Sequence, residues 1–129
     1  MAQQRLGLPT LVVGGPYGVA QTNTTFAAIH IPAKTFIPPF GVSVIVTTLL
    51  DGGTPSIEIG DADTDGWVAT EDITETTAGV YTGTGTNSAK SVTGEYYATA
   101  DTLDCILATG LTAGVFYVTA LMYDLEDVL

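Results

Sequence analysis

Basic residues are scarce in this sequence. Its 129 residues include only three, Arg5, Lys34 and Lys90, against fourteen acidic residues, and the net charge at pH 7 is −11. A chain of this charge repels the phosphate backbone of nucleic acids and the headgroups of anionic membranes. We therefore expect no direct nucleic-acid partner and no membrane partner.

Cysteine and histidine occur once each, which limits the chemistry that the chain can perform. Cys105 is alone, so no intrachain disulfide can form, and its strand-like surroundings favour a small buried hydrophobic residue. His30 stands between Ile29 and Ile31, with no Asp or Cys nearby at the spacing of a catalytic triad. The sequence also lacks a nucleophile elbow, a phosphate-binding loop and a zinc-protease motif. We predict that the protein is not an enzyme and uses no cofactor.

Long apolar runs and charged residues in general are scarce as well. No apolar run approaches the ~18 residues of a transmembrane helix. The chain does not open with a basic segment followed by an apolar one, so we expect no signal peptide. Charged residues make up 13% of the sequence, about half of the usual share, while apolar residues make up 46%. This composition suits one folded domain whose outside is largely covered by neighbouring subunits.

The sequence does contain a series of short β-strand patterns. Runs rich in β-branched and aromatic residues recur with glycine or proline between them, and no segment has a sustained helical period. This pattern predicts an all-β fold, an antiparallel β-sandwich of jelly-roll-like form, over residues 24–129. Residues 83–91 contain few apolar residues and predict an exposed loop. The expected strands are Thr24–Ile31, Val42–Leu50, Ser56–Ile59, Val80–Thr82, Val92–Thr99, Thr102–Ala108 and Val115–Tyr123.

Residues 1–23 differ from the rest and predict an extended N-terminal arm. No hydrophobic period is sustained there, and the glycines and proline of Gly14–Gly18 would interrupt any helix. Leu11, Val12 and Val13 could pair as a short strand, and we take these three residues as candidate interface residues.

The last expected strand is apolar on both of its faces, which an outer strand of a two-sheet monomer does not need. One explanation is that a loop or the N-terminal arm covers the second face. The other is a subunit interface, in which tyrosine is a favoured residue. On the second explanation the candidate interface residues are Tyr117, Leu121 and Tyr123. One face carries Phe116, Val118, Ala120 and Met122, and the other carries Val115, Tyr117, Leu121 and Tyr123.

The most suggestive motif is an acidic loop that contains Asp61, Asp63 and Asp65 before Gly66. Carboxylates at alternate positions before a glycine open the calcium loop of an EF-hand. The flanking residues look like strands and not helices, and acidic turns are common in acidic β-proteins, so we predict no metal. Asp61, Asp63 and Asp65 are the ligand candidates if calcium does bind. Trp67, beside this loop, is interpreted as a core or interface residue and not as a platform for a sugar.

Several segments together resemble small virion proteins of tailed bacteriophages. The resemblance covers roughly residues 26–124, and its motifs are patterns of strand and turn. It implies a capsid decoration, or cement, protein that has a jelly-roll-like sandwich, forms a homotrimer and bridges neighbouring major capsid proteins on the capsid exterior. No functional residue carries over, because the group has no active-site motif. The segments are Ile31–Phe36, Val42–Thr47, Pro55–Trp67, Ala78–Tyr81, Tyr97–Asp104 and Thr112–Ala120.

Other functions remain open at this stage. One is a different virion component, such as the base of a head fibre, a neck protein or a tail protein. Another is a β-sandwich module that binds Ca²⁺ or carbohydrate. A virion protein would be made in the host cytoplasm and would end up in the particle, with the major capsid protein and copies of itself as partners.

Overall fold

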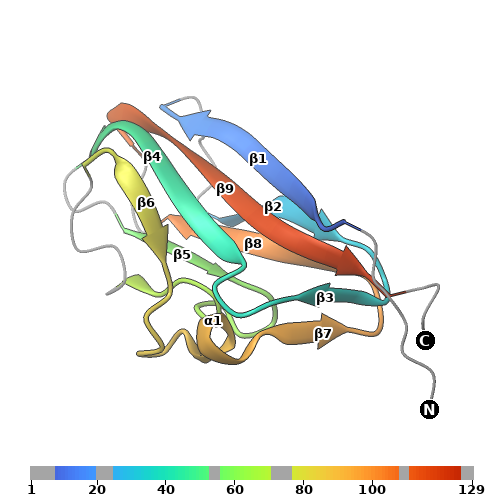
Figure 1. Cartoon of the computed structure of the whole chain (residues 1–129). Coiled ribbons are helices and arrows are strands. Elements are labelled where there is room, and N and C mark those ends of the chain that lie inside the picture. Colours follow the sequence, from blue (N-terminus) through green and yellow to red (C-terminus); the bar gives the residue numbers. More distant parts are fainter. Residues whose placement is uncertain (1–7, 20–24, 53–55, 71–76, 108–110, 126–129) are drawn as a thin grey trace, which may run out of the picture.

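Figure 1 shows a computed structural model of the chain, which describes residues 8–19, 25–52, 56–70, 77–107 and 111–125. These residues form strands and one five-residue helix, and every strand pairing is antiparallel. This confirms the predicted all-β, antiparallel β-sandwich; the jelly-roll form stays a prediction. The elements are β1 (Thr10–Gly18), β2 (Thr25–Ile31), β3 (Thr35–Ile37), β4 (Val42–Asp51), β5 (Ile57–Gly60), β6 (Gly79–Thr82), α1 (Ala89–Thr93), β7 (Glu95–Tyr97), β8 (Asp101–Leu107) and β9 (Ala113–Asp124).

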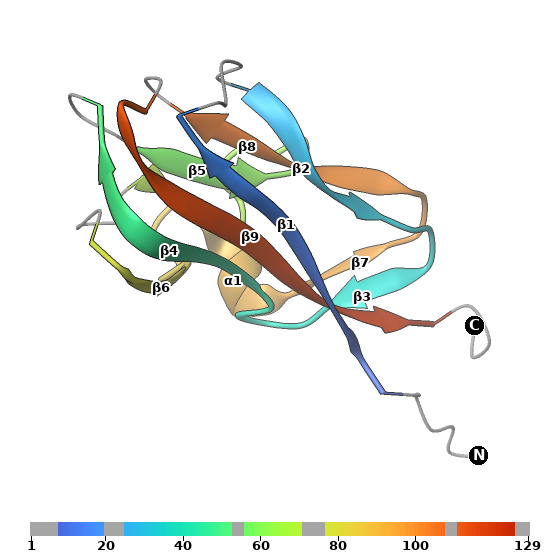
Figure 2. The ribbon, with the colours of Figure 1, turned by 90° about the horizontal axis from the view of Figure 1, so that it is seen from above.

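The strands form two sheets of unequal size, stacked as two layers (Figures 1 and 2). The large sheet has six strands, in the order β6-β4-β9-β3-β7, and β1 pairs with the other edge of β9. The small sheet has three strands, in the order β2-β8-β5. β9 is the longest strand and pairs with β1, β3 and β4, so it is the centre of the large sheet.

The core lies between the two sheets and follows from the alternation of residues along each strand. On β9 the predicted face of Phe116, Val118, Ala120 and Met122 is buried, with at most 6% of each residue exposed. Val42, Val44 and Val46 of β4 lie beside them, and Leu103, Cys105 and Leu107 of β8 face them from the small sheet. Full burial of one such aliphatic or aromatic side chain stabilises the fold by about 1.5–3 kcal/mol.

The expected arm contains a strand of the sandwich. Leu11–Val13 pair as predicted, but they belong to the longer strand β1, which runs along β9 from Thr10 to Gly18. Residues 1–7 and 20–23 lie outside the described residues, and the boundary between an arm and a domain stays a prediction.

The expectation of an exposed loop at residues 83–91 is wrong in part. Ser88 and Ser91 are fully buried, and Ala89 begins helix α1. The Ser91 hydroxyl donates a hydrogen bond to the Gly83 carbonyl at 3.0 Å. Because small polar side chains satisfied in this way can be buried at little cost, the low apolar content did not reveal this packing.

Candidate functional surface

One side of the large sheet faces away from the core, and its residues follow from the strand register. Leu11 of β1 pairs with Leu121 of β9. Tyr117 of β9 pairs with Ile45 of β4, which pairs in turn with Val80 of β6. Directly opposite residues of an antiparallel pair project to the same side of a sheet. These five apolar side chains therefore share one surface.

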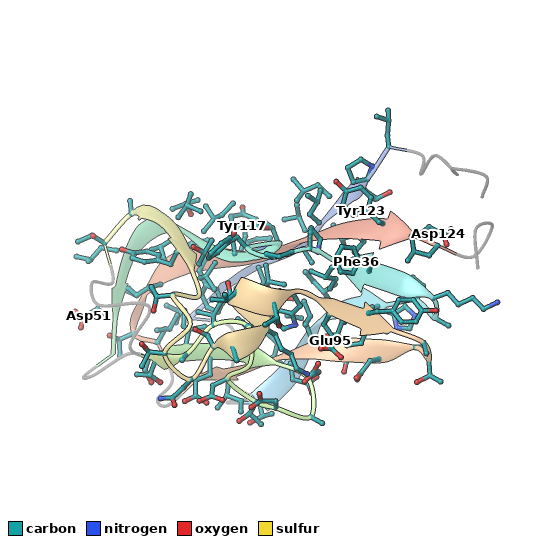
Figure 3. All side chains as sticks on the ribbon, turned by 60° about the horizontal axis from the view of Figure 1, so that its bottom comes forward. Phe36, Asp51, Glu95, Tyr117, Tyr123 and Asp124 are labelled. Atoms are coloured by element: carbon teal, nitrogen blue, oxygen red, sulfur yellow. The ribbon has the colours of Figure 1, made fainter. Side chains whose placement is uncertain are left out.

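Aromatic residues continue this surface toward the end of β9. Tyr123 pairs with Phe36 of β3, their ring centroids are 6.4 Å apart, and Phe36 pairs with Tyr96 of β7. Figure 3 shows Tyr117 and Tyr123 along β9, with the small sheet beneath the large one. We call this surface the outer face. It consists of Tyr96, Phe36, Tyr123, Leu121, Leu11, Thr119, Val13, Ser43, Thr82, Tyr117, Ile45 and Val80.

The outer face is uncharged and largely apolar, and most of its residues are exposed or half-buried. Leu11, Val13 and Val80 are 61%, 53% and 66% exposed. None of the twelve residues is Asp, Glu, Lys or Arg, although the chain carries fourteen acidic residues. A largely apolar, uncharged surface that is partly exposed typically marks a place where another molecule binds.

The opposite side of the sandwich has a different character. On the outward side of the small sheet, Glu58 of β5 pairs with Ile106 of β8, and Asp104 of β8 pairs with Ala27 of β2. The acidic loop follows directly after β5. Among the described residues, the outward side of the small sheet and the loop after it therefore carry negative charge, whereas the twelve residues of the outer face carry none.

The structure places most of the candidate interface residues together. Leu11, Tyr117, Leu121 and Tyr123 are on the outer face with Val13, although they come from the two ends of the sequence. Val12 lies on the inner side of β1, partly buried against the core. Sequence reasoning missed Ile45 and Val80 on β4 and β6, and Phe36 and Tyr96 on β3 and β7. The alternation of β4 gave the only signal for Ile45.

Asp61, the first carboxylate of the acidic loop, is buried in a hydrogen-bond network. The Nζ atom of Lys90 lies 2.7 Å from Oδ1 and 2.6 Å from Oδ2 of Asp61. The hydroxyl of Tyr97 donates to Oδ2 at 2.7 Å, and Nε1 of Trp67 donates to that hydroxyl at 2.9 Å. The backbone N–H of Asp63 donates to Oδ1 at 3.0 Å. The network joins the acidic loop, α1 and β7.

These contacts set the ionisation of the network. Burial raises the pKa of Asp61, but the hydrogen bonds from Lys90, Tyr97 and Asp63 and the charge of Lys90 outweigh it, so its pKa is lower than usual. Burial, followed by the hydrogen bond to Asp61, raises the pKa of Tyr97. Asp61 is therefore a carboxylate near neutral pH and stabilises the structure through Lys90.

The other two calcium candidates lie at the surface of the loop. Asp63 is exposed and Asp65 is half-buried. Burial, and then the hydrogen bond and charge of Asp63, raise the pKa of Asp65. Within the ranges that the structure describes, no three His, Cys, Asp or Glu side chains are grouped in a way that could hold a metal ion.

The remaining single-residue candidates are placed as follows. Trp67 is fully buried in the core. Cys105 is also buried, and desolvation raises the pKa of its thiol to about 12, so it stays protonated near neutral pH. His30 is exposed on β2 and lines a cavity between the ends of β1, β2 and β9.

No helix among the described residues is long and apolar enough to cross a membrane.

We compared the sequence and the fold with those of known proteins. No family model matches the sequence, and neither does any curated protein. Three solved structures contain a chain with a similar fold: the capsid asymmetric unit of cyanophage Pam1 (TM-score 0.55, 14% identity), the acid-stable capsid of Helicobacter pylori bacteriophage KHP30 (0.56, 13%) and the capsid of Ralstonia phage GP4 (0.57, 14%). The matches cover 96%, 94% and 96% of this chain and 92%, 90% and 88% of the other chains, in the same order. The chain therefore shares its fold, over nearly its whole length, with chains of three phage capsid structures.

Proposed function

We propose that this protein is a structural virion protein that binds and stabilises a phage capsid shell. In finer terms, we propose a decoration or cement protein on the capsid exterior, a homotrimer that bridges neighbouring major capsid proteins. It acts by contact and not by catalysis.

The observation that carries this proposal is the end-to-end likeness to chains of capsid structures. Each match covers at least 88% of the other chain, so those chains are about as long as this one. A likeness to one domain of a much longer shell protein would leave most of that protein uncovered. The matches therefore favour a small protein that occurs beside the main shell subunit.

The outer face supports the same proposal. It offers apolar area without charge, which can be buried against a neighbour at about 25 cal/mol per Å² and needs no ion to be desolvated. Many copies on one shell add their contacts, so each contact can be modest and still stabilise the particle.

The test is co-sedimentation of the purified protein with capsids that lack it, combined with its mass in solution. We expect a trimer that binds capsids and saturates. Leu121→Asn places a polar amide on the outer face and should weaken capsid binding about tenfold, the loss expected for an interface residue of this kind. The matched control is Ile106→Asn, which changes an equally half-buried residue on the small-sheet side and should bind like the wild type.

The salt dependence of capsid binding distinguishes docking through the outer face from docking through the acidic side. Because the outer face is uncharged, binding should change little between ~50 mM and ~500 mM salt. A steep loss of binding with salt, or equal losses in both variants, would place the contact on the acidic side and contradict the role of the outer face. A monomer that ignores capsids would contradict the proposal as a whole and would favour the Ca²⁺- or carbohydrate-binding module, which calcium titration then tests.

A further inference from the structure

The end of β4 carries an Asp-Gly pair, formed by Asp51 and Gly52. In such a pair the backbone nitrogen of the glycine can attack the carboxyl carbon of the aspartate, because glycine has no side chain that hinders the approach. The attack closes a five-membered succinimide ring and releases one water molecule. Water then opens the ring at either of its two carbonyl carbons, which gives aspartate or isoaspartate.

The structure holds the carboxyl group of Asp51 against the nitrogen that would attack it. The N–H of Gly52 donates a hydrogen bond to Oδ1 of Asp51, with 2.8 Å between the two heavy atoms. Groups that are held at about 3–3.5 Å from each other need little further motion to react. Figure 3 shows Asp51 at one end of the sandwich, and its exposure gives water access to the ring.

The backbone at Asp51 is held by the end of an irregular ladder. The pairing of β4 with β9 shifts its register between Thr48 and Asp51, and the pair of Asp51 with Ala113 is the last between the two strands. The N–H of Thr112 donates to the carbonyl of Asp51 at 2.9 Å. The end of an element with few contacts opens at low cost. Closing the succinimide ring therefore requires only a local rearrangement of the backbone.

Two other positions have one of these features without the other. Asp65 also precedes a glycine, but the N–H of Gly66 donates to the carbonyl of Asp63 at 2.9 Å and not to a carboxyl group. The N–H of Thr102 donates to Oδ1 of Asp101 at 2.7 Å, but threonine is β-branched and hinders the approach. Among the described residues, the pair at the end of β4 combines the glycine with the close carboxyl group.

We propose that Asp51 is a site of spontaneous covalent modification, at which the folded protein converts aspartate to isoaspartate through a succinimide. The bond that forms joins the nitrogen of Gly52 to Cγ of Asp51, and the carboxyl hydroxyl leaves as water with the amide proton. Hydrolysis at the main-chain carbonyl carbon of Asp51 then breaks its bond to that nitrogen and takes up one water molecule. Water is the only co-reactant, and no atom is oxidised or reduced.

The conversion changes the backbone and leaves the mass of the protein the same. The chain then runs through Cβ and Cγ of residue 51, so the backbone gains one methylene, and the former main-chain carbonyl becomes a free carboxylate. The hydrogen bond from Thr112 and the pairing with Ala113 cannot both keep their geometry. The ends of β4 and β9 should therefore separate in the modified protein, and the amide of Thr112 should exchange with solvent faster than in the fresh protein.

The test compares Asp51 with Asp65 in the folded protein and in the protein unfolded by guanidinium chloride, after incubation for several weeks at neutral pH. Peptide mapping with electron-transfer fragmentation quantifies isoaspartate at each residue. In the unfolded chain the two Asp-Gly pairs should convert at rates within about twofold of each other, whereas in the folded protein Asp51 should convert at least about fivefold faster. Equal conversion of both residues in the folded protein, or conversion of Asp51 only after unfolding, would overturn the proposal.

Two variants test the chemistry at residue 51 itself. Asp51→Glu keeps the carboxylate but requires a larger ring, so isoaspartate at this position should disappear while the signal at Asp65 stays the same. Asp51→Asn forms the same succinimide with ammonia as the leaving group, which departs more readily than water, so it should produce isoaspartate faster than the wild type. A folded Asp51→Asn protein that shows no conversion would mean that the turn cannot close the ring, and the proposal would be wrong.

Discussion

Replacing Lys90 by methionine removes the cation from the network around Asp61 and keeps most of the length of the side chain. Asp61 is 6% exposed, and its carboxylate accepts hydrogen bonds from Lys90, Tyr97 and the backbone N–H of Asp63. In Lys90→Met the contacts of 2.6 and 2.7 Å between Nζ and the carboxylate disappear, and a buried carboxylate is left without its counter-ion.

The expected cost follows from this geometry. Removing one partner of a buried ion pair typically destabilises a protein by about 3–5 kcal/mol. We expect about 3 kcal/mol, the lower end, because Tyr97 and Asp63 still donate to Asp61. With an unfolding entropy of about 2.1 cal/mol/K per residue over 129 residues, the melting temperature should fall by about 11 °C.

The pH dependence gives a second readout with a defined sign. The pKa of Asp61 in the folded protein is below its unfolded value of about 3.9, so its stabilising effect is complete above that pH and is lost as the pH falls through the folded pKa. In Lys90→Met, the hydrogen bond and the charge of Lys90 no longer lower the pKa of Asp61, so this pKa is higher in the variant than in the wild type. The loss of unfolding free energy in the variant should therefore be largest near neutral pH. The difference in unfolding free energy between the variant and the wild type should narrow toward about pH 3.

The assay is thermal and urea unfolding of the wild type, Lys90→Met and the double variant Asp61→Asn/Lys90→Met. The double variant should be more stable than Lys90→Met near neutral pH, because no buried charge remains. Lys34→Met, which removes an exposed lysine, is the control for loss of a positive charge. If Lys90→Met melts within about 3 °C of both the control and the wild type, the pair does not stabilise the fold as argued.

Two further predictions concern the core and the acidic loop. Cys105 is buried and its thiol has a pKa of about 12, so a thiol reagent at neutral pH should label the protein at the rate of global unfolding; fast labelling of the native protein would mean that β8 is exposed. A Cβ at Gly60 would collide with the backbone of Asp63 and Thr64, so Gly60→Ala should destabilise the fold by about 2 kcal/mol or more in urea unfolding, and a neutral effect would refute the tight turn described here.

Alternation within a strand could be predicted from the sequence, and so could the inner and outer faces of β9. The burial of Phe116, Val118 and Met122 confirms that pattern. The partners of β9 could not be predicted, because alternation contains no information on register. Consequently Leu11 and Leu121 were each candidates, but their pairing, and the addition of Val80 to the same surface, required the structure.

The hydrogen-bond network around Asp61 could not be predicted from the sequence either, because it depends on which distant segments pack together. Asp61 and Lys90 are 29 positions apart, and Asp61 and Tyr97 are 36 apart. The spacing of Asp61, Asp63 and Asp65 suggested a calcium site. Lys90, which contacts Asp61, lies in the segment 83–91 that was expected to be an exposed loop. Only the packing of α1 against that loop brings the cation and the carboxylate together.

The scarcity of basic residues has a consequence for assembly. One of the three, Lys90, is engaged by a buried carboxylate, so it does little to offset the acidic surface. Charge repulsion between proteins reaches only about 8 Å at physiological ionic strength, so it acts between two copies only where their surfaces nearly touch. Contact through the acidic small-sheet side would bring like charges together, whereas contact through the outer face would not. The charges of the described residues therefore disfavour contact between copies through the outward side of the small sheet, and the outer face carries no charge that would oppose such contact.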